Sequence, residues 1–126
     1  MSSARVFILL GAINALLSVV FGALGSHSLG LTGGALASWH TATEYQMHHA
    51  LALVLIGLVD DRWPRTVILW SGVLIQLGIL LFSGSLMVRL ATGVGAYGSL
   101  TPYGGLALLG GWLLLAIGVI RASRRR

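Results

Sequence analysis

The chain has 126 residues, of which 56% are hydrophobic and only 9% are charged, and its formal net charge is +5. The mean hydropathy is +0.92. An average soluble domain carries roughly 25% charged residues, so this composition excludes an ordinary soluble domain and is typical of an integral membrane protein. The absence of cysteine excludes disulfides, thiolate metal sites and cysteine nucleophiles.

Charge-free stretches divide the chain into four apolar segments. A membrane-spanning helix needs about 20 mostly apolar residues, so each segment is interpreted as one span. We predict an all-α fold, an integral membrane four-helix bundle that forms a single transmembrane domain over residues 1–126. The predicted spans cover about residues 6–25, 39–59, 66–88 and 102–120.

The first span combines apolar residues with a stripe of small ones. Residues 23–25 resemble a signal-peptide cleavage site, but the apolar stretch exceeds the 7 to 15 residues usual for such a peptide, which favours a retained helix. Small residues at helical spacing let another backbone approach closely, so we expect this stripe to face protein. The stripe consists of Gly11, Ala15, Ser18, Gly22 and Gly25.

The second span begins with polar residues. Its purely apolar part, residues 50–59, would be only about 15 Å long as a helix, half the thickness of the hydrocarbon layer. We therefore predict that this helix starts near Trp39, after a loop over residues 26–38 that is rich in glycine and serine.

The fourth span opens with a typical start signal. Thr101 followed by Pro102 predicts a helix N-cap with proline at the first helical position. Glycines seven residues apart mark the expected packing side of this helix. They are Gly104, Gly111 and Gly118.

The arginines predict the orientation. With four spans, both termini and the central turn lie on one side of the membrane, and that side collects all but one of the 8 basic residues. Only Arg89 lies on the other side. Basic residues favour the cytoplasmic side, so we predict cytoplasmic termini in the bacterial cytoplasmic (inner) membrane. The arginines lack the interleaved aromatics of a nucleic-acid surface, so no nucleic-acid partner is expected.

Five polar residues are expected to form a buried cluster. At about 1.5 Å per residue, Asn14 lies roughly 12 Å from the cytoplasmic end of its span, and His49 and Gln76 lie roughly 15 Å from theirs. Unpaired polar groups are costly in hydrocarbon, so these side chains should face the bundle and hydrogen-bond one another. Structural stabilisation is favoured over a relay or ligand site. The cluster comprises Asn14, Glu44, Gln46, His49 and Gln76.

Glu44, the one glutamate, lies in the outer half of the second span. Arg89 is the candidate cation on that side, so we predict a Glu44–Arg89 ion pair. A proton relay through Glu44 and its neighbours remains an alternative. So does a metal or haem site at the outer histidines, since His40, Glu44 and His48 share one helix face and His27 follows the first span.

Four segments together resemble the YgdD-like domain-of-unknown-function family, small four-span bacterial inner-membrane proteins with eukaryotic relatives. They are FGALGSH at 21–27, EYQMHHALAL at 44–53, LFSGSL at 81–86 and TPYGGLALLGGW at 101–112. The resemblance implies a motif role for Glu44, Gln46 and His49 of the cluster, and further for His27, Tyr45, Ser83, Gly84, Ser85, Thr101, Pro102, Gly104 and Gly105. His40 and His48 lie outside the motif positions, which favours His27 and His49 over them. The family brings no established activity.

The leading functional prediction is a non-enzymatic structural or accessory protein that interacts with lipids or proteins. Its expected partners are membrane lipids and either further copies of itself or a larger membrane complex, and no cofactor is expected. The first alternative is a proton or small-solute pathway through Glu44, His49 and Gln76. An enzyme is not expected, because Asp60 and Asp61 are interpreted as caps or solvated turn residues, and no nucleophile lies beside a base.

Overall fold

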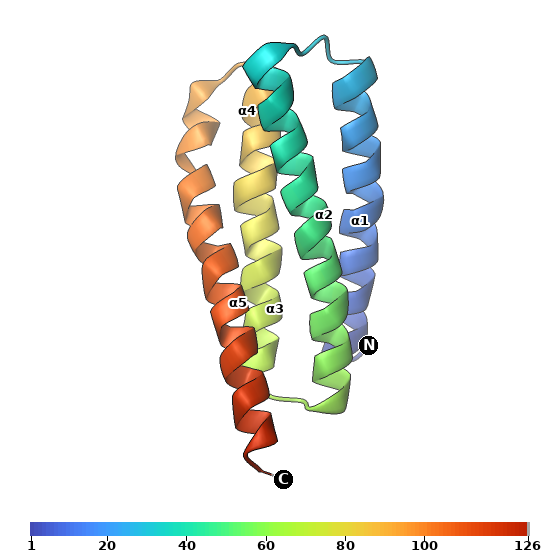
Figure 1. The fold of residues 1–126 in the computed structure, drawn as a ribbon, viewed down its shortest axis with the longest axis vertical. Coiled ribbons are helices and arrows are strands. Elements are labelled where there is room, and N and C mark those ends of the chain that lie inside the picture. Colours follow the sequence, from blue (N-terminus) through green and yellow to red (C-terminus); the bar gives the residue numbers. More distant parts are fainter. Residues whose placement is uncertain (126) are drawn as a thin grey trace.

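The computed structural model describes residues 1–125 as four long antiparallel helical rods joined by short connections (Figure 1). No β-strand occurs in this range, so the predicted all-α fold is confirmed. The elements are α1 (Ser3–His27), α2 (Gly33–Arg62), α3 (Thr66–Gly78), the π-helix η1 (Ile79–Gly84), α4 (Ser85–Thr92), the 3-10 helix η2 (Gly95–Ser99) and α5 (Thr101–Ser123).

The third rod is continuous from α3 through η1 to α4. The backbone at both joints, Gly78 and Ser85, keeps right-handed helical angles. The π segment coincides with the place where α5 approaches most closely, because a Cβ on Gly104 would collide with the backbone of Leu81 and Phe82. Single π turns inside α-helices are frequent at functional sites, so the residues around η1 are candidates for such a site.

The rods pack in a row. α1 packs against α2, α2 against α3, and α3 against α5. α1 and α5 form the two ends of the row, and both termini lie at the same end of the rods as the connection after α2 (Figure 1). Cavities lie between two helix pairs that are not neighbours in the row, α1 with α3 and α2 with α5, and we call these two places grooves.

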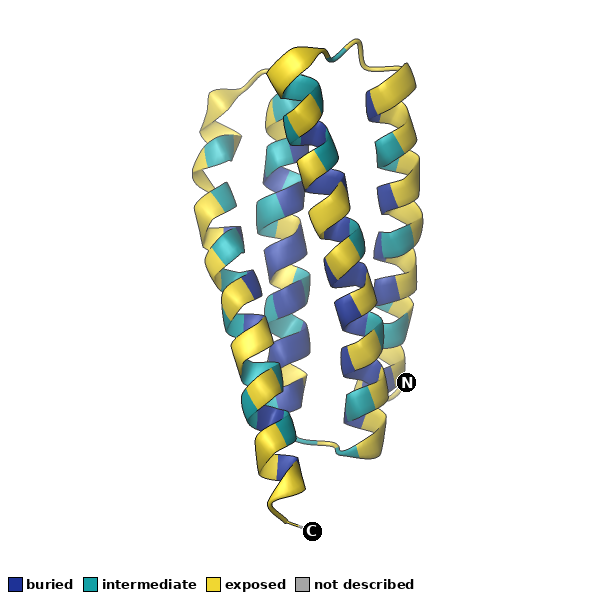
Figure 2. Cartoon of the chain, viewed as in Figure 1, coloured by how far each residue is buried: buried dark blue, intermediate teal, exposed yellow. Residues whose placement is uncertain are grey.

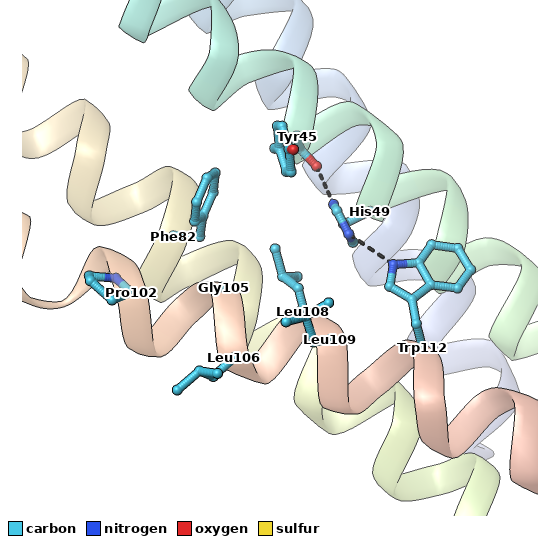
Figure 3. A pocket seen from close by; sticks show the side chains of 9 residues that line it. All are labelled: Tyr45, His49, Phe82, Pro102, Gly105, Leu106, Leu108, Leu109 and Trp112. Carbon is cyan, nitrogen blue, oxygen red and sulfur yellow. Dashed lines mark hydrogen bonds between the residues drawn. The ribbon is translucent and has the colours of Figure 1, made fainter.

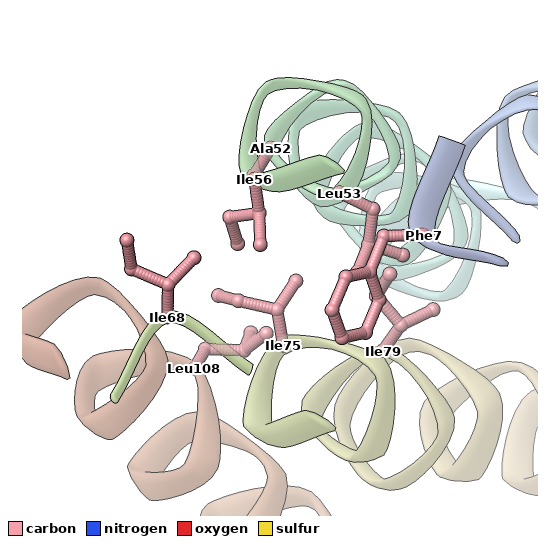
Figure 4. Close-up of a cluster of buried hydrophobic side chains, with 8 residues drawn as sticks. All are labelled: Phe7, Ala52, Leu53, Ile56, Ile68, Ile75, Ile79 and Leu108. Carbon is pink, nitrogen blue, oxygen red and sulfur yellow. The ribbon is translucent and has the colours of Figure 1, made fainter. Parts of the chain in front are cut away.

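A buried apolar cluster joins all four rods (Figure 4). In lipid, burying such side chains brings little of the gain it brings in water, so helix association depends on close packing and on hydrogen bonds. The cluster consists of Phe7, Ala52, Leu53, Ile56, Ile68, Ile75, Ile79 and Leu108.

The outer faces of α1 and α5 remain largely uncovered (Figure 2). Only 22% of the most apolar window of each of these rods is buried, against 39% for the third rod. Their exposed side chains are large and apolar, among them Leu16 and Leu109. A helix that is apolar all round and still exposed suits contact with lipid or with another membrane protein.

Three helical segments are long and apolar enough to cross a membrane, namely Ser3–His27, Thr66–Thr92 and Gly95–Ser123. α2 is not among them, although its 30 residues would extend about 45 Å. Its first half carries the polar residues around Glu44, which lower its hydropathy.

The predicted start of the second helix was six residues too late. α2 begins at Gly33, so the predicted loop shrinks to a short turn. Gly30 in this turn and Gly33 at the start of α2 both adopt positive φ. Trp39 lies within the helix and its indole nitrogen donates to the Phe21 carbonyl at 2.7 Å. This bond ties the beginning of α2 to the end of α1.

The fourth rod starts close to the predicted residue, but Thr101 is not its N-cap. Leu100 occupies the N-cap, and Thr101 is the first helical residue. The Thr101 hydroxyl instead lies 2.7 Å from the Ser85 hydroxyl, so it ties α5 to α4. The predicted packing side is confirmed, since a Cβ on each of the glycines would meet the third rod; these are Gly104, Gly111 and Gly118.

Candidate functional site

An amide ladder crosses three rods at mid-height. Gln46 Nε2 on α2 donates to Asn14 Oδ1 on α1 at 3.5 Å, and Asn14 Nδ2 donates to Gln76 Oε1 on α3 at 3.0 Å. Asn14 and Gln46 are 6% and 3% exposed. Three of the five residues predicted to cluster therefore meet. Amides do not titrate, so this ladder stabilises the helix assembly without exchanging protons.

Glu44 does not join the ladder. It is exposed on α2, because positions i and i+2 of a helix face different sides and Gln46 takes the inward one. Arg89 is exposed as well, and among residues 1–125 the structure shows no ion pair between the two side chains. The placement of Glu44 in a buried cluster and the Glu44–Arg89 pair are both wrong.

His49 is buried but bonds to a residue that the sequence did not single out. Trp112 Nε1 on α5 lies 3.0 Å from His49 Nε2, and His49 Nδ1 lies 2.7 Å from the Tyr45 carbonyl oxygen (Figure 3). An indole nitrogen can only donate, so Nε2 accepts and the ring proton is on Nδ1, which donates to the carbonyl. Both nitrogens of a neutral imidazole are thereby satisfied.

A cavity of about 570 Å³ opens beside this histidine, between α2, η1 and α5 (Figure 3). The volume falls within the roughly 300–1,000 Å³ of small-molecule sites. The lining is dominated by apolar and aromatic side chains, and its described part contains no acidic, serine or thiol group. The residues are Tyr45, His49, Phe82, Pro102, Gly105, Leu106, Leu108, Leu109 and Trp112.

Aromatic contacts shape one wall of the cavity. The Tyr45 ring stacks on His49 with centroids 5.9 Å apart and tilts against Phe82 at 4.9 Å. On the opposite wall, Leu106 and Leu109 line the cavity and are 65% and 68% exposed, so the cavity is open at the outer surface of α5.

The remaining motif residues support this region in different ways. Pro102 and Gly105 line the cavity, whereas Ser83 is buried and its hydroxyl has no hydrogen-bond partner in the described chain. Ser85 Oγ also donates to the Leu81 carbonyl. Gly84 borders a separate small cavity beside Trp39.

The outer histidines are not brought together into a ligand set. His27 is exposed at the end of α1, and His40 Nε2 lies 3.3 Å from the Ser26 hydroxyl. Residues 1–125 contain no group of three or more histidine, cysteine, aspartate or glutamate side chains that could hold a metal ion.

Two residues outside the predicted site matter for the architecture. Trp112 donates the hydrogen bond to His49. The sequence could have identified it, because it lies in the middle of a predicted span and tryptophan is enriched at the membrane interfaces instead. Asp60, predicted to be a cap or solvated turn residue, is 4% exposed and accepts a hydrogen bond from the Ser3 hydroxyl. It ties the end of α2 to the start of α1.

The fold and the cavity together define an all-helical chain with three segments able to cross a membrane and an apolar cavity between its rods. The family described as a protein of unknown function (DUF423) matches residues 21–105, which contain the cavity-forming segments of α2 and η1. The chain belongs to this family.

Curated bacterial relatives match over almost the whole chain. A UPF0382 membrane protein of Staphylococcus saprophyticus is 42% identical over 119 residues, covering 93% of this chain and 98% of the relative. The UPF0382 membrane protein YwdK of Bacillus subtilis is 38% identical over 120 residues, with 93% and 98% covered. No solved structure matches. The narrower YgdD-like resemblance stays a prediction.

Proposed function

We propose that this protein is a non-enzymatic accessory component of the bacterial cytoplasmic membrane that binds the acyl chain of a membrane lipid in the cavity between α2 and α5. The observation that carries the proposal is the cavity itself, which is apolar, about 570 Å³ in volume and open at the lipid-facing surface of α5. An acyl chain is the apolar molecule that a membrane supplies in greatest abundance at this place.

The proposal includes four spans with both termini in the cytoplasm. α2 lies between α1 and α3 along its length, and both of those rods are apolar enough to span. Two buried polar side chains in the middle of α2, Gln46 and His49, bond to neighbouring rods, which lets a helix of lower hydropathy lie in lipid. The relatives' printed description as membrane proteins supports the location, and the arginine distribution supports the orientation.

The contacts favour lipid binding over a proton pathway. The ring nitrogens of His49 are engaged with a carbonyl and an indole N–H, and the indole cannot accept a proton. Gln76 bonds to Asn14, while Glu44 is exposed. Among the described residues, no hydrogen bond connects Glu44, His49 and Gln76 into one chain.

Lipid retention in gentle detergent tests the proposal. Gly105→Leu directs a side chain into the cavity, and its Cβ would meet only Phe82 Cδ2 at 3.9 Å, an ordinary contact. Native mass spectrometry should show a retained phospholipid on the wild type and a retained fraction at least about tenfold lower in the variant, equivalent to roughly 1.4 kcal/mol. Ala116→Leu is the matched control, because it adds apolar volume to an exposed position of α5 outside the lining.

Equal retention by the wild type and Gly105→Leu, with the same helix content by circular dichroism, would place the lipid elsewhere and refute the cavity as its site. Equal loss in Ala116→Leu would also count against the cavity, since any added bulk on α5 would then have the same effect.

A further inference from the structure

A second cavity, of about 440 Å³, lies at the end of the molecule that holds both termini. It is formed by the start of α3 and the end of α5, and arginine side chains from both helices line it. The lining consists of Pro64, Arg65, Thr66, Val67, Arg121 and Arg125. It shares no residue with the apolar cavity between α2 and α5.

Three positive charges converge here without a negative partner. Within residues 1–125, Arg65, Arg121 and Arg125 form no ion pair, and no acidic side chain contributes to the lining. The buried acid of this end, Asp60, is engaged with Ser3. Like charges around one cavity repel one another, so an anion bound among them would lower the electrostatic energy of the arrangement.

The positions of the arginines at the helix ends indicate more than a preference of basic residues for the cytoplasmic side. Arg121 lies in the last turn of α5, where a cation is favourable beside the negative end of the helix dipole. Arg65 occupies the N-cap of α3, where the positive end of the α3 dipole disfavours a cation, and no side chain caps the free N–H groups of that end. An anion between the helices would compensate both Arg65 and the uncapped N–H groups.

We propose that this cavity binds a phosphate group, either of an anionic phospholipid headgroup or of free phosphate. Guanidinium groups match phosphate oxygens with paired hydrogen bonds. Arg121 in the last turn of α5 and Arg125, just beyond the end of α5, line the cavity together with Arg65 at the start of α3. The cavity lies at the predicted cytoplasmic border of the membrane, where basic pockets between helices meet lipid headgroups.

Thermal unfolding of the full chain in an uncharged detergent, at constant ionic strength, tests the site. Phosphatidylglycerol and inorganic phosphate are titrated separately, with diacylglycerol, which has acyl chains but no phosphate, as the control for acyl-chain binding. A headgroup site predicts a rise in Tm with phosphatidylglycerol alone, and a free-phosphate site predicts a rise with inorganic phosphate as well. In Arg65→Gln and Arg121→Gln the titration midpoint should shift to at least about tenfold higher concentration, as loss of a charged hydrogen bond implies.

Arg5→Gln is the matched control, since it removes one charge at the same end but outside the cavity. Its midpoint should stay within about twofold of wild type, because an exposed charge outside the site contributes only screened attraction. Arg121→Lys keeps the charge and guards against a folding defect; it should still bind several-fold more weakly, because lysine lacks the planar fork.

The site is overturned if neither phosphatidylglycerol nor phosphate raises Tm beyond the diacylglycerol control. It is equally overturned if Arg5→Gln weakens binding as much as Arg65→Gln does, or if Arg121→Lys binds like wild type, because general attraction would then suffice. In Gly105→Leu the rise in Tm that comes from acyl-chain binding should fall, whereas the additional rise that comes from the phosphate group should keep its midpoint, so this site can be tested separately from the acyl-chain cavity.

Discussion

Two helix contacts in this protein differ sharply: the close contact between α1 and α2 around Gly11, called the seam below, and the groove between α2 and α5. In the seam, Gly11 lets the backbones meet so closely that an added Cβ would lie 2.6 Å from the Ala50 carbonyl oxygen. In the groove, aromatic side chains hold the helices apart, and one bond between His49 and Trp112 spans the gap beside the cavity.

The difference shows what each arrangement can provide. Small residues exchange side-chain volume for close backbone packing, which is the main source of helix association in lipid. Large rings at the facing positions prevent that approach and leave space for a molecule. Stability therefore concentrates in the seam, while the groove retains room to bind.

The largest predicted effect comes from filling the seam. Gly11→Leu forces a side chain against Val54 and the Ala50 carbonyl, and the backbones must separate to admit it. Overpacking costs about 1–3 kcal/mol and occasionally more, and here the added side chain meets backbone atoms, so we expect about 3 kcal/mol. The measurement is the free energy of unfolding in mixed micelles, followed by circular dichroism.

Gly34→Leu supplies the control for this comparison. Gly34 lies in the first turn of α2 with nothing within 4 Å of an added Cβ, and its φ is not positive. The change should be nearly neutral, within about 0.5 kcal/mol, as for most exposed positions. If Gly11→Leu unfolds as readily as Gly34→Leu, the seam is not closely packed.

A smaller effect is predicted for the amide ladder beside the seam. Asn14→Leu removes the bonds to Gln46 and Gln76 and leaves the Gln46 amide, 3% exposed, without its partner. Hydrogen bonds between membrane helices average about 0.6 kcal/mol each, and an orphaned buried group adds to the loss, so we expect about 1–2 kcal/mol.

A double-mutant cycle between Asn14→Leu and Gln76→Leu isolates one rung of the ladder. The coupling energy should be about 0.6 kcal/mol, because the two side chains share the 3.0 Å hydrogen bond. Strictly additive losses would mean that the two amides do not interact across the helices.

Sequence reasoning predicted the seam better than the groove. Glycine spacing along α1 and α5 follows from helix periodicity, so the packing sides could be predicted from residue type and position alone. The mid-depth level shared by Asn14 and Gln76 likewise follows from counting residues along each helix, which is why their bond was anticipated.

The groove depends on rotations that the sequence does not encode locally. Whether Glu44 or Gln46 points inward depends on how α2 turns about its axis, and this rotation is set by packing against α1. The bond from Trp112 to His49 joins residues 63 positions apart and exists only because α5 lies across η1 from α2. Counting residues along each helix gives the depth of a side chain, but it does not predict which neighbouring helix that side chain faces.

The smallest predicted effect tests the bond across the groove. Trp112→Phe keeps a ring at the cavity wall but removes the indole donor, so His49 Nε2 loses its partner at 3.0 Å. One such bond contributes about 0.6 kcal/mol, far less than the expected cost of Gly11→Leu. Nitrogen-15 resonances of the labelled histidine provide the sharper measurement: Nε2 should appear unprotonated in the wild type and Nδ1 protonated, since the indole can only donate. Phe82→Leu is the control, because it changes another aromatic residue of the cavity lining without touching this bond. A protonated Nε2 in the wild type would show that the indole does not donate to it, and the groove would then be held open by ring contacts alone.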